Sequence, residues 1–452
     1  KAAASIFYGI NYVPHKAITM GLRTILDAKR IILIAWGEEK AYVVKELVEG
    51  ERQLLVPATC LQEHQNMEVV VDEGAASQLT RIRTPWLVGR CLWPKRFIRT
   101  AVLWLCEQVD KPILKLTYQD YVDNRLGQLL EISGMAYDEI NIQVFNDLQH
   151  TITGWPGGKP NADDSTRPER AQPFPKRVLI FSPHPDDDVI SMGGTFRRLI
   201  TQGHDVHVAY ETSGNIAVHD DVVLQTIDTA RECGFEDKYD EVKAIIAGKR
   251  KGEPEPLELR KLKGSIRRAE AKAACRHMGL NDRTNVHFLN LPFYETGGVK
   301  KGLLTENDIS RVVKLLQELK PDQIYAAGDL SDPHGTHRTC IEAVIEAMYQ
   351  IQNEPWVKDC RFWLYRGAWQ EWDLDMVDMA VPLSPDEVVQ KRHAIYRHLS
   401  QKDVMPFPGE DKREFWQRAE ERTQNTARMY DKLGMAEYQA IEVFVRLDLF
   451  KL

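Results

Sequence analysis

Short apolar runs alternate with amphipathic segments in the second half of the chain, and this alternation predicts strands and helices in turn. The apolar runs cover residues 178–181, 206–210, 286–289 and 323–327, and a long basic segment at 257–278 has a helical pattern. Apolar runs without polar alternation are typical of parallel strands that are buried on both faces. The order of these segments predicts an α/β fold of three layers, with helices on both faces of a parallel sheet.

A shorter strand-and-helix pattern lies near the start of the chain. The apolar run at residues 31–35 is followed by a glycine turn at Gly37, and an amphipathic helix opens close to Lys40. Because free backbone N–H groups at the start of a helix bind anions, this arrangement predicts that Lys40 faces a phosphate group. A strand-to-helix turn without a ligand has the same pattern, so both interpretations stay open. In either case the pattern predicts a small α/β segment at the N-terminus.

Composition divides the chain into three parts. We expect a partial α/β segment over residues 1–80, a connecting region with a linker over 81–173, and a larger α/β domain over 174–452. The connecting region begins with apolar stretches that indicate packed structure, such as 102–106. Residues 154–164 are rich in Gly, Pro and Asp, which indicates an extended linker or a surface loop.

The charge and the cysteines narrow the class of protein. The 452 residues carry 59 basic and 66 acidic side chains, a net charge of −7, which gives no electrostatic basis for binding nucleic acid. Seven cysteines are scattered without a CxxC pair, which favours reduced thiols in a cytoplasmic protein. Because no apolar run reaches the roughly 18 residues of a membrane-spanning helix, we expect no membrane contact.

Polar clusters follow the first and the fourth of the predicted strands. His184 and the three aspartates at 186–188 come directly after the first strand, and His334 and His337 follow the fourth. Ligands bind at the carboxyl ends of the strands in open α/β sheets, so we expect the two clusters in one pocket. Neutral imidazole together with carboxylate suits Zn²⁺ or another divalent metal. Acidic residues after a strand also cap helix N-termini, which is the alternative for the aspartates.

Four motifs carry a resemblance to a known family. They are Pro183-His184-Pro185-Asp186-Asp187-Asp188 with Gly193-Gly194, Arg267-Arg268-Ala269-Glu270-Ala271-Lys272-Ala273-Ala274, Pro333-His334-Gly335-Thr336-His337 and Lys391-Arg392-His393-Ala394-Ile395-Tyr396-Arg397-His398-Leu399-Ser400-Gln401. Together these motifs resemble the LmbE-like family of zinc-dependent N-acetylglucosaminyl deacetylases, the PIG-L-type enzymes. The resemblance covers about residues 176–452, and it implies a Rossmann-like fold and an amide hydrolase.

The resemblance implies a role for each polar residue of the two clusters. His184, Asp187 and His337 would hold the metal, and Asp186 would be the general base for the attacking water. His334 would stabilise the oxyanion or protonate the leaving amine. These roles meet the needs of amide hydrolysis, which are an activated water, a stabilised oxyanion and a proton for the amine.

Two further positions have two interpretations each. The family commonly has glutamate where this chain has Asp188, and Asp188 either supports a metal ligand or caps the helix. Arg267 either reaches the hydroxyls or phosphate of the substrate or lies on a solvated basic helix face. Many family members have an acidic sugar-binding residue where Phe293 stands here, with Glu295 nearby. This difference predicts altered recognition of the sugar.

The N-terminal segment resembles a different family. Residues 17–21, 31–41, 56–62 and 69–73 resemble the C-terminal part of glucosamine-6-phosphate deaminase. The resemblance places Lys40 on a residue that binds the sugar phosphate. Because the catalytic parts of that family lie upstream of the matched part, we expect a longer parent chain and no deaminase activity from this chain alone. The whole chain resembles a glucosamine-6-phosphate deaminase-like fusion protein.

The two resemblances lead to three functional hypotheses. The first is a zinc-dependent deacetylase that acts on a small-molecule amino sugar of the N-acetylglucosamine type, with a homo-oligomeric chain. The second is a deaminase or isomerase whose catalytic half lies upstream, and the third is a sugar-phosphate-binding scaffold without catalysis. Deacetylation produces the amino sugar that a deaminase consumes. A parent chain with both halves would therefore run consecutive steps of amino-sugar metabolism.

Overall fold

The computed structural model describes residues 16, 18–163, 165–235, 239–250, 253–298, 300–329, 335–367, 370–402 and 413–449. Contacts divide this chain into two compact units, of which the first ends at Asn146 and the second begins at Asp147. The boundary between the two units, at Asn146 and Asp147, lies inside the expected connecting region. The domain boundaries expected at residues 80 and 173 stay a prediction. None of the helices described here combines the length and the hydropathy that a membrane crossing requires.

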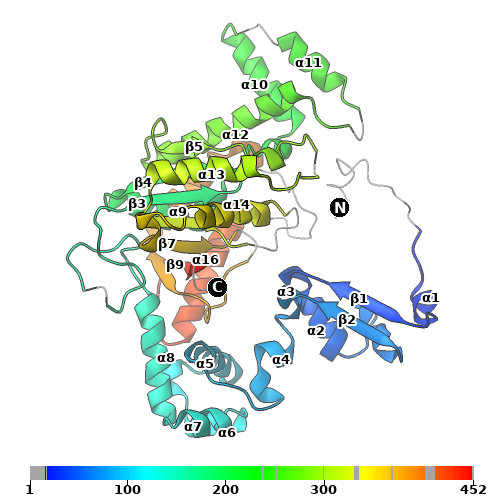
Figure 1. Cartoon of the computed structure of the whole chain (residues 1–452), viewed down its shortest axis with the longest axis vertical. Helices are drawn as coiled ribbons and strands as arrows, with labels where there is room; N and C mark the ends of the chain where they lie inside the picture. The colour runs from blue at the N-terminus through cyan, green and yellow to red at the C-terminus, as the bar shows by residue number, and fades with distance from the viewer. Residues whose placement is uncertain are drawn as a thin grey trace. The chain divides into compact units, whose positions relative to one another are not determined.

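The first unit contains a small parallel sheet and a group of helices (Figure 1). Strands β1 (Ile31–Ala35) and β2 (Met67–Val71) pair in parallel, with Ile31 opposite Met67 and Ala35 opposite Val71. The helices are α1 (Leu22–Leu26), α2 (Ala41–Glu49), α3 (Glu73–Ala76), α4 (Thr80–Arg83), α5 (Lys95–Val109), α6 (Tyr118–Asp123), α7 (Gly127–Ser133) and most of α8 (Tyr137–Thr151). The apolar side of α5 is buried, so this part of the connecting region is packed rather than extended.

The second unit is built on a seven-stranded sheet in the order β5-β4-β3-β6-β7-β9-β8. The strands are β3 (Arg177–Ser182), β4 (Asp205–Tyr210), β5 (Val286–Phe288), β6 (Gln323–Ala327), β7 (Arg361–Tyr365), β8 (Met379–Leu383) and β9 (Ala440–Arg446). The neighbouring strands from β5 to β7 pair in parallel, which confirms the predicted parallel α/β sheet. Strand β9 runs antiparallel to both of its neighbours, β7 and β8, and the apolar runs predicted none of these three strands.

Helices cover both faces of this sheet, so the second unit has three layers (Figure 1). They are α9 (Asp187–Thr201), α12 (Leu257–Met278), α13 (Glu306–Leu319), α14 (Thr336–Gln350), α15 (Pro385–Ile395) and α16 (Phe415–Lys432). Two further helices of this unit are α10 (Asp220–Glu232) and α11 (Tyr239–Ala247). Val178 and Ile180 of β3 pack in a core with residues of α9 and α12, while Leu179 and Phe181 pack with α13 and α14. Strand β3 is therefore buried on both faces, as predicted.

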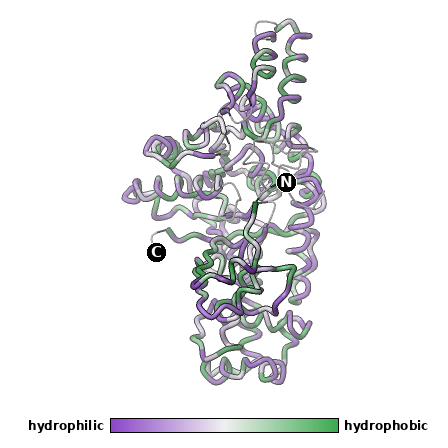
Figure 2. The backbone as a smooth tube through the Cα atoms, turned by 90° about the vertical axis from the view of Figure 1, so that its right-hand side faces the viewer, coloured by the Kyte–Doolittle hydropathy of each residue, from purple (hydrophilic) through white to green (hydrophobic). Residues whose placement is uncertain are grey.

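Helices α10 and α11 form a pair that packs on α12 through an apolar cluster of its own. Val223 and Ile227 of α10 are buried in this cluster with Val242 of α11 and Leu259 of α12. Figure 2 shows hydrophilic purple and hydrophobic green alternating along these two helices at the top of the view. This alternation is the pattern of amphipathic helices, which bury an apolar side and expose a polar one.

The register of the sheet brings two distant segments to one edge. Strand β3 ends at Ser182, which pairs with Tyr210 at the end of β4, and β6 ends at Ala327 on the other side of β3. The chain enters α9 after β3, and it enters α14 after β6. His184 and His337, 153 positions apart in the sequence, therefore lie at the same edge of the sheet.

Helix α9 is broken at Met192, whose φ of −136° and ψ of 27° are not helical. Beyond the break, the backbone N–H groups of Gly194 and Thr195 donate to the carboxylate of Glu442 at 3.1 and 2.7 Å. Lys391 donates to the same carboxylate at 2.7 Å, and both side chains of this ion pair are buried. Glu442 of β9 therefore caps the N-terminal end of the second part of α9.

The first part of α9 is held by another buried side chain. Arg422 of α16 donates to the carbonyl oxygen of Ser191 at 2.9 Å and to that of Ile190 at 3.4 Å. These carbonyls end the short helical part before the break, so a cation lies at its negative end. The second part begins with glycines that allow close packing, since a Cβ atom at Gly194 would lie 2.5 Å from Leu383.

Candidate active site

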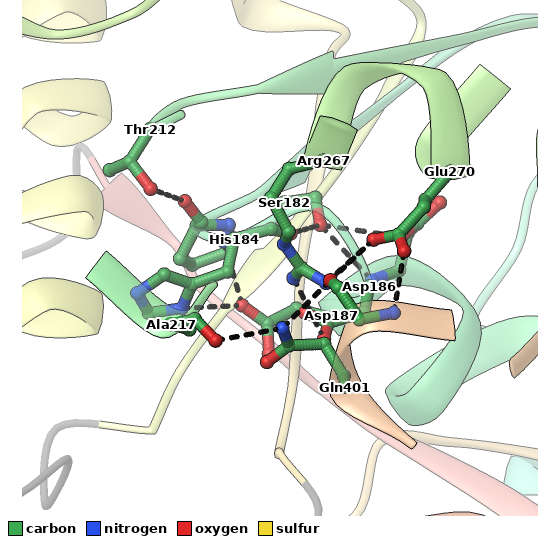
Figure 3. Close-up of polar contacts among 12 residues, drawn as sticks. Ser182, His184, Asp186, Asp187, Thr212, Ala217, Arg267, Glu270 and Gln401 are labelled. Atoms are coloured by element: carbon green, nitrogen blue, oxygen red, sulfur yellow. Dashed lines mark hydrogen bonds and ion pairs between the residues drawn. The ribbon is translucent and has the colours of Figure 1, made fainter. Parts of the chain in front are cut away.

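The three predicted metal ligands lie together at this edge of the sheet, and Figure 3 shows two of them, His184 and Asp187. His184 lies in the turn after β3, Asp187 begins α9, and His337 lies in the first turn of α14. His184 Nδ1 lies 3.2 Å from Asp187 Oδ2 and 3.3 Å from His337 Nε2. His337 Nε2 lies 3.3 Å from Asp187 Oδ2. Among the residues that the structure describes, these three bring their ligand atoms together in the manner of a metal site.

The three ligand atoms form a triangle with sides of 3.2–3.3 Å. Ligands of a tetrahedral zinc ion with bonds of about 2.0 Å are separated by roughly 3.3 Å, so the triangle fits one face of such a tetrahedron. Burial by itself raises the pKa of Asp187. The charge of His337 and the hydrogen bonds of both histidines lower this pKa by more than burial raises it. The net shift is downward, and it keeps Asp187 in the ionised form that a metal ligand needs. The donor set therefore suits zinc or another divalent metal.

Hydrogen bonds within the turn after β3 hold these ligands in place. The backbone N–H of His184 donates to Asp187 Oδ2 at 2.8 Å, so the carboxylate closes the turn. The hydroxyl of Ser182 donates to the carbonyl oxygen of His184 at 2.6 Å. Thr212 Oγ1, in the loop after β4, donates to the carbonyl oxygen of Pro183 at 2.7 Å (Figure 3). The turn is therefore fixed from its own residues and from the neighbouring strand.

Asp186, the predicted general base, is paired with Arg267 of α12. Arg267 Nη2 lies 3.0 Å from Asp186 Oδ2, and Arg267 Nη1 lies 3.4 Å from Glu270 Oε2 (Figure 3). Burial alone lowers the pKa of Arg267, but the charges of Asp186 and Glu270 raise it above its ordinary value. Arg267 is 1% exposed, so the interpretation of a solvated helix face is wrong. Its contact with substrate stays a prediction, since its guanidinium lies between two carboxylates.

Glu270 connects the motif on α12 with the motif that ends at Gln401. Its carboxylate accepts the backbone N–H of Ser400 at 2.6 Å and the hydroxyl of Ser400 at 2.7 Å. Gln401 Nε2 donates to the carbonyl oxygen of Ala217 at 3.2 Å (Figure 3). Two motifs more than a hundred residues apart are thus joined by one buried carboxylate.

A small pocket adjoins Asp186. His398 and Gln401 line it together with Tyr396 and Trp416. Burial lowers the pKa of His398 to about 3, so its imidazole is neutral. His398 belongs to the fourth family motif, for which we expect structural support near the site, and it lines this pocket beside the predicted base.

Asp188 is fully buried beneath the turn. Its Oδ2 accepts the hydroxyl of Tyr210 at 2.9 Å, and its backbone N–H donates to Ser182 Oγ at 3.1 Å. Burial raises the pKa of Asp188 to about 7. Asp186 occupies the N-cap position of α9 but makes no capping hydrogen bond with its side chain. Asp186 is therefore not a capping residue, while Asp187 and Asp188 lie in the first turn of α9, where the helix dipole favours carboxylates. The supporting role of Asp188 stays a prediction.

Two further residues near the ligands were not predicted from the sequence as site residues. Glu211, directly after β4, is buried, and this burial raises its pKa to about 8 although the charge of His337 opposes the shift. The ring of Tyr294 lies 5.9 Å from the ring of His184, and Lys301 Nζ lies 3.7 Å from the centre of the Tyr294 ring. Both residues lie in loops at the carboxyl ends of predicted strands, and this position was the sequence feature that could have indicated a place near the site.

The residue at the expected sugar-binding position belongs to the core. Phe293 is buried among the apolar residues on the α13 side of the sheet, and its backbone N–H donates to Asp308 at 2.9 Å. Glu295 Oε2 accepts the side-chain amide of Asn215 at 2.9 Å. The altered recognition of the sugar that Phe293 suggested stays a prediction.

Two predicted site residues are not part of this cluster. His334 lies outside the described residues, so its role stays a prediction. Lys40 belongs to the first unit, where it is exposed at the end of the turn Glu38–Lys40 that precedes α2. The N–H of Gly37 before that turn donates to both carboxylate oxygens of Asp72, each at 3.1 Å. This N–H is therefore not directed at a phosphate, and phosphate binding by Lys40 stays a prediction.

Comparison with known proteins finds relatives for both parts of the chain. The family model PIG-L, described as GlcNAc-PI de-N-acetylase, matches residues 179–348. A putative glucosamine-6-phosphate deaminase-like protein of Bacteroides thetaiotaomicron is 52% identical over 456 residues, which cover 98% of this chain and 68% of that protein. The glucosamine-6-phosphate deaminase of Lactococcus lactis subsp. cremoris is 47% identical over 81 residues, which cover 18% of this chain and 34% of that enzyme.

Two solved structures resemble part of this chain at low sequence identity. The N,N'-diacetylchitobiose deacetylase of Pyrococcus horikoshii is 21% identical with a TM-score of 0.40, over 61% of this chain and 85% of that chain. The 4-carboxy-2-hydroxymuconate hydratase GalB of Pseudomonas putida is 18% identical with a TM-score of 0.39, over 60% of this chain and 96% of that chain. The family model and the sequence relatives confirm both resemblances seen in the motifs. The chain belongs to the family of glucosamine-6-phosphate deaminase-like proteins, and it carries a PIG-L-type domain.

Proposed function

We propose that this chain hydrolyses the N-acetyl amide of an N-acetylglucosamine-type amino sugar in a metal-dependent reaction. The observation that carries the proposal is the triangle of His184 Nδ1, Asp187 Oδ2 and His337 Nε2, with Asp186 next to it in the same turn. The match of residues 179–348 to a family described as de-N-acetylases supports the same chemistry. The expected partner is a small-molecule amino sugar.

His184, Asp187 and His337 would hold the metal. When bound, a divalent ion such as zinc supplies a Lewis acid that polarises the amide carbonyl and increases the acidity of water. The hydrogen bonds of the turn hold His184 and Asp187 in their positions, so the donor set needs little reorganisation to take up an ion.

Asp186 accepts the proton of the attacking water in this proposal. A carboxylate within hydrogen-bond reach of the water is a competent general base. Arg267 holds Oδ2 of Asp186, and Glu270 holds Arg267 from the other side. This buried chain of charges fixes the direction in which Asp186 presents its carboxylate. For His334 we propose the role that its motif implies, which is to stabilise the oxyanion or to protonate the leaving amine.

The test is acetate release from N-acetylglucosamine and from its 6-phosphate by the purified chain, with added zinc and with a chelator. We expect release that depends on zinc and that the chelator abolishes. Asp186→Asn should lower kcat by about 10²- to 10⁴-fold, because a positioned general base contributes that much to the rate. The metal content of the variant, measured by mass spectrometry, should stay unchanged, since Asp186 is not one of the three ligands.

Asp221→Asn is the matched control, because Asp221 is exposed in the first turn of α10. It should release acetate at the rate of the unchanged chain. Equal release by the Asp186→Asn variant would contradict the proposed base. No release by a chain that holds its metal would point to a different acylated substrate, and no release together with no metal would favour a scaffold.

The match to a glucosamine-6-phosphate deaminase favours a second function for the first unit. Because this chain spans only 34% of that enzyme, we propose deaminase activity only for a longer parent chain. Deacetylation of the sugar releases the amine that a deaminase consumes, so the two units would serve consecutive steps. A parent chain that acts on only one of the two substrates would contradict this second proposal.

A further inference from the structure

The pocket beside Asp186 contains a buried imidazole with unused hydrogen-bonding capacity. His398 lines this pocket and is 2% exposed. Within the described part of the chain, neither Nδ1 nor Nε2 of His398 has a hydrogen-bond partner. Nearly all buried polar side chains of native proteins have such a partner, because leaving one without it costs free energy. A ligand that enters the pocket can supply partners for both nitrogens.

The imidazole selects the chemical class of this ligand. Burial lowers the pKa of His398 to about 3 although the charges of Asp186 and Asp187 oppose the shift, so only one ring nitrogen carries a proton. His398 therefore offers one donor and one acceptor, and a hydroxyl group can use both. A carboxylate has no proton to donate, and an ammonium group has no lone pair to accept a bond. The imidazole therefore fits a neutral hydroxyl better than either charged group.

Much of the wall of the pocket is apolar, and one aromatic ring in it has a fixed orientation. Ile190 and Ile395 are buried, and Trp416 lies beside them in the lining. Trp416 Nε1 donates to Glu414 Oε2 at 2.9 Å, and the Tyr396 ring meets the Trp416 ring at a centre distance of 5.8 Å and an angle of 86°. Ligand pockets combine apolar and aromatic walls with a few polar groups that orient the ligand. A sugar ring fits such a pocket, because it carries C–H groups on its faces and hydroxyls at its rim.

Buried contacts connect this pocket to the predicted base. Asp186 lines the pocket, and Arg267 links Asp186 to Glu270 (Figure 3). Glu270 also accepts the backbone N–H and the hydroxyl of Ser400, two residues after His398. These contacts fix the position of His398 relative to Asp186. A hydroxyl that binds His398 therefore belongs to the part of the substrate next to the reacting amide.

We propose that this pocket holds part of the sugar ring of the substrate, and that His398 recognises a hydroxyl next to the acetamido group. The Trp416 ring packs against C–H groups of the same sugar. The assignment rests on the proposed function, because it places the reacting amide at Asp186. In N-acetylglucosamine the hydroxyls next to the acetamido group are those on carbons 1 and 3. A sugar without the recognised hydroxyl leaves the imidazole buried without a partner, so His398 determines specificity.

The experiment first uses the unchanged chain with zinc. It compares acetate release from N-acetylglucosamine or its 6-phosphate, whichever reacts faster, with release from the 1-deoxy and 3-deoxy analogues of the same sugar. We expect kcat/KM to be at least about tenfold lower for one analogue, because a site built to bind a hydroxyl rejects a substrate that lacks it. Equal kcat/KM for all three sugars would overturn the proposal. The result does not depend on the folding of a variant.

His398→Leu then separates recognition from structural support. This variant should lower kcat/KM for the parent sugar at least about tenfold, but it should change kcat/KM for the rejected analogue by less than about twofold. An equal loss for both sugars would overturn the proposal, since a structural role does not distinguish them. His398→Gln keeps a donor and an acceptor and should restore most of the discrimination. His150→Leu is the matched control, because His150 is exposed in the last turn of α8, and both sugars should react as with the unchanged chain.

Trp416→Leu tests the aromatic wall. Packing against C–H groups contributes equally to the binding of all three sugars, so this variant should raise each KM and leave each kcat nearly unchanged. An unchanged KM would contradict the contact with Trp416.

Calorimetry with the same three sugars and zinc distinguishes this proposal from the proposed function. A dissociation constant at least about tenfold larger for one analogue, without acetate release from any sugar, would support the pocket and contradict the deacetylase. Acetate release with equal kcat/KM from the parent sugar and both analogues would support the deacetylase and overturn the assignment of His398.

Discussion

Replacing Lys391 by methionine should loosen the second part of α9. Methionine keeps an apolar stem against Gly193, where an added Cβ atom would lie 2.9 Å from Lys391 Cγ, but it removes the ammonium group. Glu442, whose side chain is 1% exposed, would then stay in the core without its cation. Breaking a buried ion pair costs about 3–5 kcal/mol, and the two N–H groups that still bind Glu442 place the expected cost near the lower figure.

The pH dependence of this cost has a definite sign. Burial raises the pKa of Glu442, but the charge and the hydrogen bond of Lys391 lower this pKa by more. The net shift of the pKa is therefore downward. A carboxyl with a lowered pKa stabilises the fold above its unfolded pKa of about 4.3, and this contribution is lost as the pH falls through the folded-state pKa. Without Lys391, burial dominates and the pKa of Glu442 rises. The cost of Lys391→Met should therefore shrink on acidification, because Glu442 takes up a proton in the folded chain.

Hydrogen exchange of peptides from α9 in increasing urea measures this cost locally, which matters because two compact units need not unfold together. Glu442→Gln and the double variant complete a double-mutant cycle. We expect a coupling free energy of at least about 2 kcal/mol, because the double variant leaves no unpaired charge in the core. A cost below about 1 kcal/mol for Lys391→Met, the range of an exposed pair, would refute the reasoning. A cost that grows on acidification would refute it as well.

Three further changes test other features of the chain. Gly194→Ala should cost about 1–3 kcal/mol in urea unfolding by overpacking against Leu383, whereas Gly89→Ala, with open space around it, should change stability by less than about 0.5 kcal/mol. Burial lowers the pKa of His204 to about 4. As the pH falls, His204 therefore takes up a proton in the unfolded chain before it does so in the folded chain. The fold should lose about 3 kcal/mol as the pH falls from about 6.5 to about 4, and the pH dependence of urea unfolding should be weaker in His204→Asn. Zinc at about 100 times its dissociation constant should raise the free energy of unfolding by about 2.7 kcal/mol, and Asp187→Asn should abolish this increase.

The central strands were predictable because their side chains are apolar on both faces. The apolar run at 323–327 coincides with β6, and the other three runs match β3, β4 and β5 to within one residue at each end. Strand β9 escaped prediction because Glu442 interrupts its apolar pattern. The break in α9 also escaped prediction, since the residues that hold its two parts lie 231 and 248 positions further along the chain. No local window of sequence contains both sides of these contacts.

Part of the candidate site was also predictable from the sequence, and part of it was not. Sheet topology and the family motifs together led to the prediction that His184 and His337 meet, because both follow strands whose carboxyl ends share an edge. The burial of Arg267 was not predictable from its own helix, where a basic residue among basic neighbours indicates an exposed face. It depends on Asp186 and Glu270, which surround the guanidinium only in the folded chain.

The broken helix also sets an order of events during synthesis. Asp187 leaves the ribosome long before Arg422 and Glu442, which hold the two parts of α9. Until α16 has emerged, the short helical part that begins with Asp187 lacks its cation, and until β9 has emerged, the part after Met192 lacks its cap. The turn with the metal ligands therefore gains its final support only when nearly the whole second unit has been made.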